Sequence, residues 1–296
     1  MSNTGLIIEE RSRDIGDFLV GRLLPFREKR MVGPFIFIDH MGPSEIRDGH
    51  YLDIDPHPHI GLSTLTYLFE GAVEHRDSVG TVQRIEAGSV NWMTAGKGVT
   101  HTERTPQDMR KGNTHRMHGF QIWVALPKHK EHIEPSFHHV GAAELPQWRK
   151  NGLHFTLVAG TAFEHQSPVP VHSPLYMLEV KADAAGEFSA DGLFGEVGIC
   201  VIEGSITACE DTVGKGNMLI AKSKEACQIQ VAAGSHLLIF GGEPFPEKRH
   251  IFWNFVSTEM ALIEKAVDDW QNHRFPEVPN ETGYIPSPDI PKGFKS

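Results

Sequence analysis

The chain has 296 residues, of which 40% are hydrophobic and 22% are charged, and its formal net charge is -10. This acidic balance disfavours a nucleic-acid-binding surface, which would be basic. We expect a cytoplasmic protein without membrane partners, because no apolar run is long enough to span a bilayer and the first residues do not resemble a secretion signal. The widely spaced Cys200, Cys209 and Cys227 are expected to be reduced thiols rather than metal ligands.

Short β-prone runs open the chain, and the third of them is Phe35-Ile36-Phe37-Ile38. Glycines and prolines separate the runs, which is typical of strands joined by turns. The third run passes into Asp39 and His40, for which two interpretations stay open. They belong to a polar turn that Asp39 caps, or they lie behind a metal ligand and orient it.

His57-Pro58-His59 is the first stretch with the spacing of a metal site. Residues i and i+2 of a strand point to the same face, so these two imidazoles project together. A further strand is expected at 61–69. In the absence of a bulge, the same parity places Leu65, Tyr67 and Phe69 in the cavity that the imidazoles face.

Residues 74–85 are expected to form a hairpin that turns near 77–80. His75 is a single histidine there, and we expect it to be solvent-exposed rather than a ligand. The glycines on either side of Lys97 lack the spacing of a phosphate-binding loop and indicate a tight turn. From that turn the chain enters His101-Thr102-Glu103, the second stretch with two metal-capable side chains two residues apart.

Together the two stretches predict a mononuclear metal site on neighbouring strands. Its expected ligands are His57, His59, His101 and Glu103. Three imidazoles and one carboxylate suit Fe, Mn, Co, Ni, Cu or Zn, whereas a closed structural zinc site would usually include cysteine. An octahedral ion would keep positions for water, substrate or O₂. Glu103 is also the candidate catalytic base, because it is the strong base of the set.

Beyond this site, Gln121 and Trp123 share a strand face and either line a pocket or belong to the core. The histidines between 129 and 139 indicate a solvated connection. Later β-runs predict a second β-domain that lacks an HxH or HxE pair, so we expect no metal there. Its expected role is structural, and its surface is a candidate for binding a protein partner.

The last part of the chain changes character. From Thr258 to Trp270, apolar residues recur at helical spacing, and Ser257 is the expected N-cap of that helix. The proline-rich residues 277–296 are expected to extend along the surface.

Four stretches resemble the pirin family of the cupin superfamily: DHMGP (39–43), HPHIG (57–61), NWMTAGKGVTHTE (91–103) and HGFQIWVALP (118–127). The resemblance runs from about residue 15 to 245. It implies two cupin-type β-barrel or jelly-roll domains, with iron or another divalent metal in the N-terminal one. It also implies the same four ligands. Most cupins carry a glutamate four or five residues after HxH, where this chain has Ser63 and Thr64, so the carboxylate comes from Glu103 instead.

We therefore predict an all-β fold with a metal-binding cupin domain at 1–140, a cupin domain without metal at 141–245, and a helix and tail at 246–296 that pack across the domains. The resemblance implies a quercetin 2,3-dioxygenase-like enzyme, which would use O₂ on a flavonol-like substrate with iron as the first candidate metal. One alternative is a metal- or redox-responsive regulator that binds protein. Another is a cupin isomerase, which lacks a visible phosphate-binding cluster here.

Overall fold

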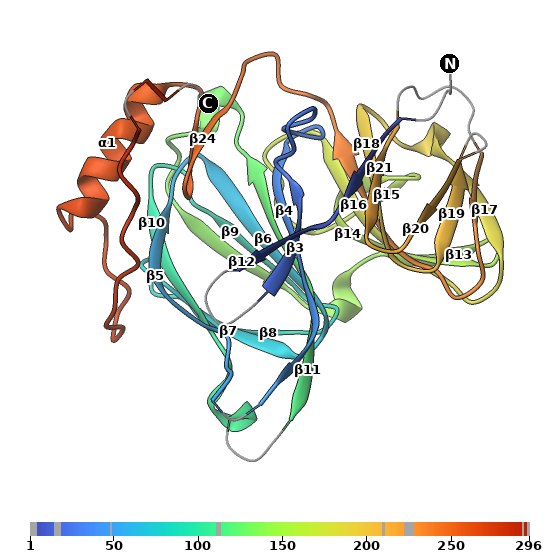
Figure 1. Ribbon diagram of the computed structural model, residues 1–296, viewed down its shortest axis with the longest axis horizontal. Coiled ribbons are helices and arrows are strands. Elements are labelled where there is room, and N and C mark those ends of the chain that lie inside the picture. The colour runs from blue at the N-terminus through green and yellow to red at the C-terminus, as the bar shows by residue number, and fades with distance from the viewer. Residues whose placement is uncertain are drawn as a thin grey trace. The chain divides into compact units, whose positions relative to one another are not determined.

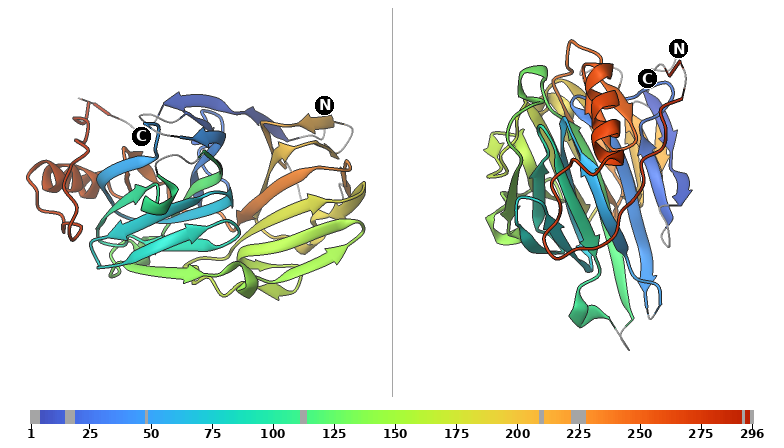
Figure 2. Two further views of the ribbon diagram at one scale, coloured as in Figure 1. Left: turned by 90° about the horizontal axis from the view of Figure 1, so that it is seen from below. Right: turned by 90° about the vertical axis from the view of Figure 1, so that its left-hand side faces the viewer.

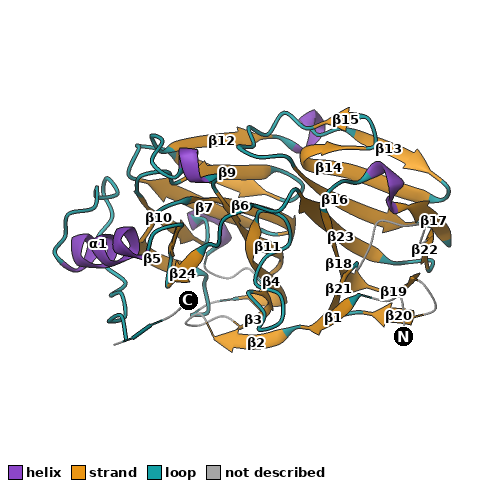
Figure 3. Cartoon of the chain, turned by 90° about the horizontal axis from the view of Figure 1, so that it is seen from above, coloured by secondary structure: helices purple, strands orange, loops and turns teal. Residues whose placement is uncertain are grey.

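A computed structural model describes residues 5–14, 19–47, 49–110, 114–208, 211–221, 228–291 and 293–294. Strands dominate these residues, and α1 (Met260–Gln271) is the α-helix among them (Figures 1 and 3). The predicted all-β fold with a C-terminal helix is therefore confirmed. No helix of the described chain has the length and apolar character needed to cross a membrane.

The chain folds as two compact units, each assembled from separate pieces of sequence. The first, which we call the companion unit, consists of Met1–Arg13, Val20–His40 and Val140–Pro244. The second, which we call the histidine unit, consists of Asp14–Leu19, Met41–His139 and Phe245–Ser296. The companion unit thus takes residues from both sides of the histidine unit's main segment in the sequence. The domain limits expected at 140 and 245 stay a prediction.

The companion unit contains an eight-stranded sheet and a four-stranded sheet. The larger sheet has the order β1 (Leu6–Glu9), β21 (Asn217–Ile220), β18 (Glu196–Glu203), β23 (His236–Gly242), β16 (Leu175–Ala182), β14 (Leu153–Ala162) and β13 (Gln147–Lys150), with β15 (His165–Gln166) paired to β14. The smaller has the order β17 (Gly186–Ser189), β22 (Gln228–Val231), β19 (Ser205–Ala208) and β20 (Asp211–Gly214). Alternate residues of both sheets, such as Leu178, Ile199 and Ile229, form one apolar core.

The histidine unit also combines a four-stranded sheet with a larger one. The smaller sheet has the order β5 (Asp53–His59), β10 (Val99–Arg104), β7 (Ala72–Asp77) and β8 (Val82–Glu86). The larger has the order β12 (Ser136–Val140), β9 (Val90–Thr94), β6 (Leu62–Glu70), β11 (His115–Ala125) and β4 (Phe35–Ile46), of which β4 belongs to this unit only from Met41 on. The strands β2 (Arg11–Asp14) and β3 (Leu19–Leu24) belong for the most part to the companion unit. The hairpin predicted at 74–85 is confirmed, because β7 and β8 pair antiparallel from Ala72–Glu86 to Arg76–Val82.

A two-stranded sheet and α1 complete the histidine unit. The strands are β24 (His250–Phe252) and β25 (Phe255–Ser257). The apolar face of α1 is buried as predicted, through Ile263, Val267 and Trp270. The predicted N-cap is wrong, because the cap position is Glu259. Ser257 Oγ instead accepts a hydrogen bond from the Glu259 N–H and donates one to Glu131.

The C-terminal tail lies beside α1, as both views of Figure 2 show. It has no regular secondary structure from 277 to 291, as expected. Tyr284 stacks on Trp270 with ring centroids 4.7 Å apart, and the Trp270 indole N–H donates to the Ile285 carbonyl. The Ile285 N–H donates in turn to the Pro56 carbonyl, one residue before His57. The tail is therefore attached to the strand that carries the HxH pair.

Candidate metal centre

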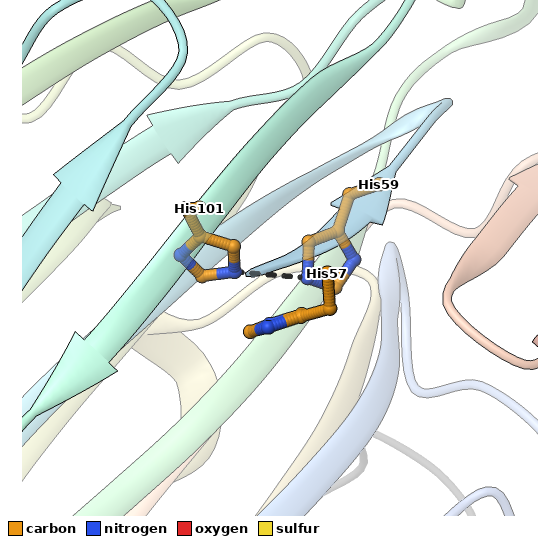
Figure 4. A group of neighbouring side chains, drawn as sticks. All are labelled: His57, His59 and His101. Carbon is orange, nitrogen blue, oxygen red and sulfur yellow. Dashed lines mark hydrogen bonds between the residues drawn. The ribbon is translucent and has the colours of Figure 1, made fainter. Parts of the chain in front are cut away.

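Three buried histidines converge in the histidine unit, with their rings turned toward one another (Figure 4). His57 and His59 lie at the end of β5, and His101 lies opposite His57 on the neighbouring strand β10. One candidate ligand atom from each of the three side chains lies within 4.8 Å of the others. Their exposed fractions are 7%, 1% and 1% in sequence order. The structure thus confirms the prediction that the two strands are neighbours. Their pairing brings three of the four expected ligands together.

Backbone carbonyls hold the outer nitrogens of the first two rings. His57 Nδ1 lies 2.9 Å from the Asp55 carbonyl oxygen, and His59 Nδ1 lies 3.2 Å from that of Asn254. A carbonyl oxygen only accepts, so Nδ1 carries the proton in each neutral ring and Nε2 keeps its lone pair. Asn254 lies in the turn between β24 and β25, far from His59 in sequence, so no local sequence signal indicates this contact.

His101 is held by side chains instead. Its Nδ1 lies 3.3 Å from His75 Nδ1, and His75 Nε2 lies 3.0 Å from Asp77 Oδ2. The prediction that His75 is solvent-exposed is wrong, because only 3% of it is exposed. The cause is the pairing of β7 with β10, which places His101 opposite Asp77 and Glu103 opposite His75.

The inner nitrogens fit a metal ion. His59 Nε2 and His101 Nε2 lie 3.1 Å apart, the contact drawn as a dashed line in Figure 4. If His101 carries its ring proton on Nδ1, as His59 does, both of these nitrogens present lone pairs, which repel one another unless a cation lies between them. Two imidazole nitrogens that each lie about 2.1 Å from one ion, at roughly a right angle, are about 3.0 Å apart. The donor set and its spacing therefore suit a divalent cation.

Burial keeps the three imidazoles in the form that binds metal. It lowers the pKa of His57 to about 4, partly opposed by the hydrogen bond to Asp55. Burial and the neighbouring histidines lower the pKa of His59 and of His101 well below the ordinary value. The rings are therefore neutral at physiological pH, and a neutral imidazole binds an ion without first losing a proton.

Glu103 lies two residues after His101 on β10 but does not join the close group of histidine nitrogens. Its Oε1 lies 3.4 Å from Thr66 Oγ1, and that hydroxyl lies 2.8 Å from Gln121 Oε1. One hydroxyl proton cannot serve both acceptors. If the Gln121 amide is turned over, it donates to Thr66 and leaves the hydroxyl proton for Glu103. Burial raises the pKa of Glu103, opposed by His75 and by the Thr66 hydrogen bond.

A polar row crosses the larger sheet beside Glu103. Thr66 on β6 lies opposite Asn91 on β9 and opposite Gln121 on β11, so the three side chains share one face. Asn91 is 3% exposed, and its Nδ2 has no hydrogen-bond partner among the described residues. The row gives the interior a donor that is free to bind a ligand.

This row corrects the predicted parity of β6. Thr66, not Leu65 or Tyr67, faces the interior, because alternate residues of a strand point to opposite faces. The alternation of inward and outward residues is interrupted at Gly61, whose φ of +69° separates β5 and β6 into different sheets. Of the two interpretations of Trp123, the structure supports the core. It is buried, and its ring centroid lies 5.1 Å from that of His59.

Asp39 and His40 lie inside β4 rather than in a turn, so the turn interpretation is wrong. In the companion unit, Asp39 accepts two hydrogen bonds from Arg22, and His40 pairs with Glu10.

Cys200 is a buried free thiol, and burial raises its pKa. Cys209 and Cys227 lie outside the described residues.

Comparisons with known proteins agree over most of the chain. The sequence profile named Pirin matches residues 18–124, and the one for the pirin C-terminal cupin domain matches residues 177–276. A pirin-like protein of Caulobacter vibrioides is 42% identical over 288 residues, which cover 96% of this chain and 99% of that protein. A Pseudomonas aeruginosa protein named "Putative quercetin 2,3-dioxygenase" is 36% identical over 268 residues, or 89% of this chain and 82% of that protein. The crystal structure of a quercetin 2,3-dioxygenase from Acinetobacter baumannii superposes with a TM-score of 0.90 at 36% identity, covering 99% of this chain and 97% of that one.

Proposed function

The chain belongs to the pirin family of two-domain cupin proteins, and on that premise we propose that it is a metal-dependent dioxygenase that uses O₂ on a flavonol-like substrate. The observation that carries the proposal is the convergence of three buried imidazoles on one point. The similarity to proteins named quercetin 2,3-dioxygenase supports the substrate class. Iron is the first candidate metal, and Mn, Co, Ni, Cu and Zn suit the same donors.

The residues of the site divide into two roles. His57, His59 and His101 hold the ion, and we propose that Glu103 completes the set as the carboxylate. A bound ion would supply Lewis acidity and, for a redox-active metal, a path for O₂ to react with the substrate. Glu103 takes the hydroxyl proton of the substrate.

The polar row supports a substrate that carries oxygen atoms. Asn91 Nδ2 is a buried donor without a partner among the described residues, so a carbonyl or phenolate oxygen of a ligand would satisfy it. Gln121 is partly exposed and connects the row to solvent. A planar polyphenol that binds beside Glu103 would place its oxygen atoms along this row.

The test is O₂ uptake with quercetin, using chelator-treated protein that is reloaded with Fe, Mn, Co, Ni or Cu. We expect turnover with at least one metal, and we expect Glu103→Gln to lower it by about 10²–10⁴-fold because the base is lost. Glu134→Gln is the matched control, since Glu134 is an exposed carboxylate paired with Lys97. Turnover of Glu103→Gln at the wild-type rate would remove the base role, and no turnover with any metal would exclude the dioxygenase.

A second candidate function is a metal-responsive regulator that binds protein. The burial of the three rings favours it, since exposed fractions of 1–7% leave the ion little direct access to solvent. Metal binding without turnover, together with a protein partner captured only by the loaded form, would support this candidate. The cytoplasmic location stays a prediction under either function.

A further inference from the structure

We propose that Asp77 and His75 form a positioning pair that fixes the tautomer of His101 and so decides whether its Nε2 can bind the ion. The inference rests on the proposed metal site, but it concerns two residues that are not ligands. Its basis is a continuous series of contacts from a buried carboxylate to the inner face of the site.

Asp77 is built as a fixed acceptor. Its side chain is 0% exposed, and its Oδ1 accepts the backbone N–H groups of Val79 and Thr81 at 3.0 and 2.9 Å. These two bonds hold the carboxylate in the β7–β8 turn. Oδ2 is left to accept from His75 Nε2 at 3.0 Å. A carboxylate in this arrangement has no proton to give, so it dictates where the proton of His75 lies.

The proton positions follow from one end of the series to the other. Asp77 Oδ2 only accepts, so we place the ring proton of His75 on Nε2 and its lone pair on Nδ1. That lone pair faces His101 Nδ1 at 3.3 Å, so His101 carries its proton on Nδ1. The Nε2 of His101 is then unprotonated and directed toward His59 Nε2. The outermost carboxylate therefore sets the state of the innermost nitrogen.

His75 is held firmly enough to transmit this constraint. Its ring stacks on Phe137 with centroids 4.6 Å apart and an interplanar angle of 27°. The strand register also places His75 and Asp77 on the same face of β7, opposite Glu103 and His101 on β10. Rotation of the ring would break the stacking and both polar contacts together.

His101 differs in this respect from the other two histidines. The Nδ1 atoms of His57 and His59 donate to backbone carbonyls, which accept in every variant of the protein. The Nδ1 atom of His101 contacts an imidazole nitrogen, which is either a donor or an acceptor. A substitution of Asp77, which contacts His101 only through His75, can therefore invert the tautomer of His101. No comparable substitution inverts the tautomers of His57 and His59.

Asp77→Asn performs that inversion. The carboxamide oxygen can still accept from Val79 and Thr81, so the turn keeps its hydrogen bonds. The NH₂ group that replaces Oδ2 donates to His75 Nε2, which moves the His75 proton to Nδ1. His101 Nδ1 must then accept, so the His101 proton moves to Nε2 and occupies the position of the metal. His75→Gln is the matched control, because its amide offers an acceptor to His101 and a donor to Asp77.

Two measurements on the full chain test the pair. The first is the ¹⁵N NMR assignment of the histidine tautomers in chelator-treated protein, which needs no metal. We expect the Nδ1–H form of His101 in the wild type and in His75→Gln, and the Nε2–H form in Asp77→Asn. An Nε2–H form in the wild type overturns the proposal, and this remains decisive if Asp77→Asn fails to fold.

The second measurement is Co²⁺ affinity by competition with a chelator, alongside the thermal midpoint of the metal-free protein. We expect Asp77→Asn to weaken Co²⁺ binding by about 10–100-fold with a midpoint near the wild type, and His75→Gln to bind within about threefold of it. Wild-type affinity in Asp77→Asn, or equal loss in both variants, overturns the pair. If the wild type binds no Co²⁺, the metal site itself fails, and the tautomer measurement alone decides the inference.

Discussion

The two units share an architecture and differ in what fills it. Each combines a four-stranded sheet with a larger one. In the companion unit the smaller sheet contributes Phe188, Ile229 and Val231 to an apolar core. In the histidine unit the smaller sheet contributes histidines to a buried polar interior. The layers are thus common to both, and the chemistry lies in the inward residues of a few strands.

The difference also has an energetic side. Inward apolar residues stabilise the companion unit by leaving water, whereas buried imidazoles lose their hydration and must recover it from hydrogen bonds. Each of the three rings of the site recovers one such bond at Nδ1 and leaves Nε2 for the ion. We expect the unit with the site to depend on metal and on pH in ways that the companion unit does not.

The sharpest test of this difference removes one histidine from each unit. His101→Ala should weaken metal binding by at least about 100-fold and lower any turnover by about a thousandfold, because a ligand of the ion is lost. His236→Ala should keep both, since His236 bonds to Glu179 in the companion unit. Elemental analysis and O₂ uptake of the two variants provide the measurement. Equal metal content in wild type and His101→Ala would contradict the site.

Acid should destabilise the metal-free histidine unit first. The ordinary pKa of histidine is 6.5, and that of folded His57 is about 4, so the unfolded chain binds more protons between these values. Stability is then present above pH 6.5 and falls as the pH drops toward 4, by up to about 3 kcal/mol for His57 alone. Peptide-resolved hydrogen exchange at several pH values measures the loss in each unit.

The companion unit should respond in a lower pH window. Burial raises the pKa of Glu179, but hydrogen bonds from His236 and Lys181 outweigh it and lower the pKa to about 2 from an ordinary 4.5. The stability that Glu179 contributes is therefore present above pH 4.5 and lost as the pH falls toward 2. Loss of protection in both units over one common window would contradict the separation.

Metal loading should have a smaller effect than removal of a histidine or a change of pH. An ion that binds only the folded state stabilises it by about 2.7 kcal/mol when its free concentration is 100 times the dissociation constant. We expect slower hydrogen exchange in β5, β7 and β10 on addition of Co²⁺, and no change in β16 or β23. Equal protection of both units by Co²⁺ would mean that the ion does not act through the three histidines.

Much of the site could be predicted from local sequence. The HxH and HxE pairs share a face because strand side chains alternate, and the structure confirms that their strands are neighbours. The same rule failed for Leu65, because a glycine with positive φ at position 61 ended one strand and began another in a different sheet. The alternation rule also could not predict the burial of His75, which depends on which strand pairs with β7.

The sequence by itself determined the β-rich class, the helical end and the pairs of metal-capable side chains, since these follow from periodicities of two and 3.6 residues fixed by backbone geometry. Only the tertiary structure decided which groups hold those pairs. The Asn254 carbonyl reaches His59 across 195 positions, and Asp77 reaches His101 only through a paired strand. Such contacts depend on strand order and packing, which no local period encodes.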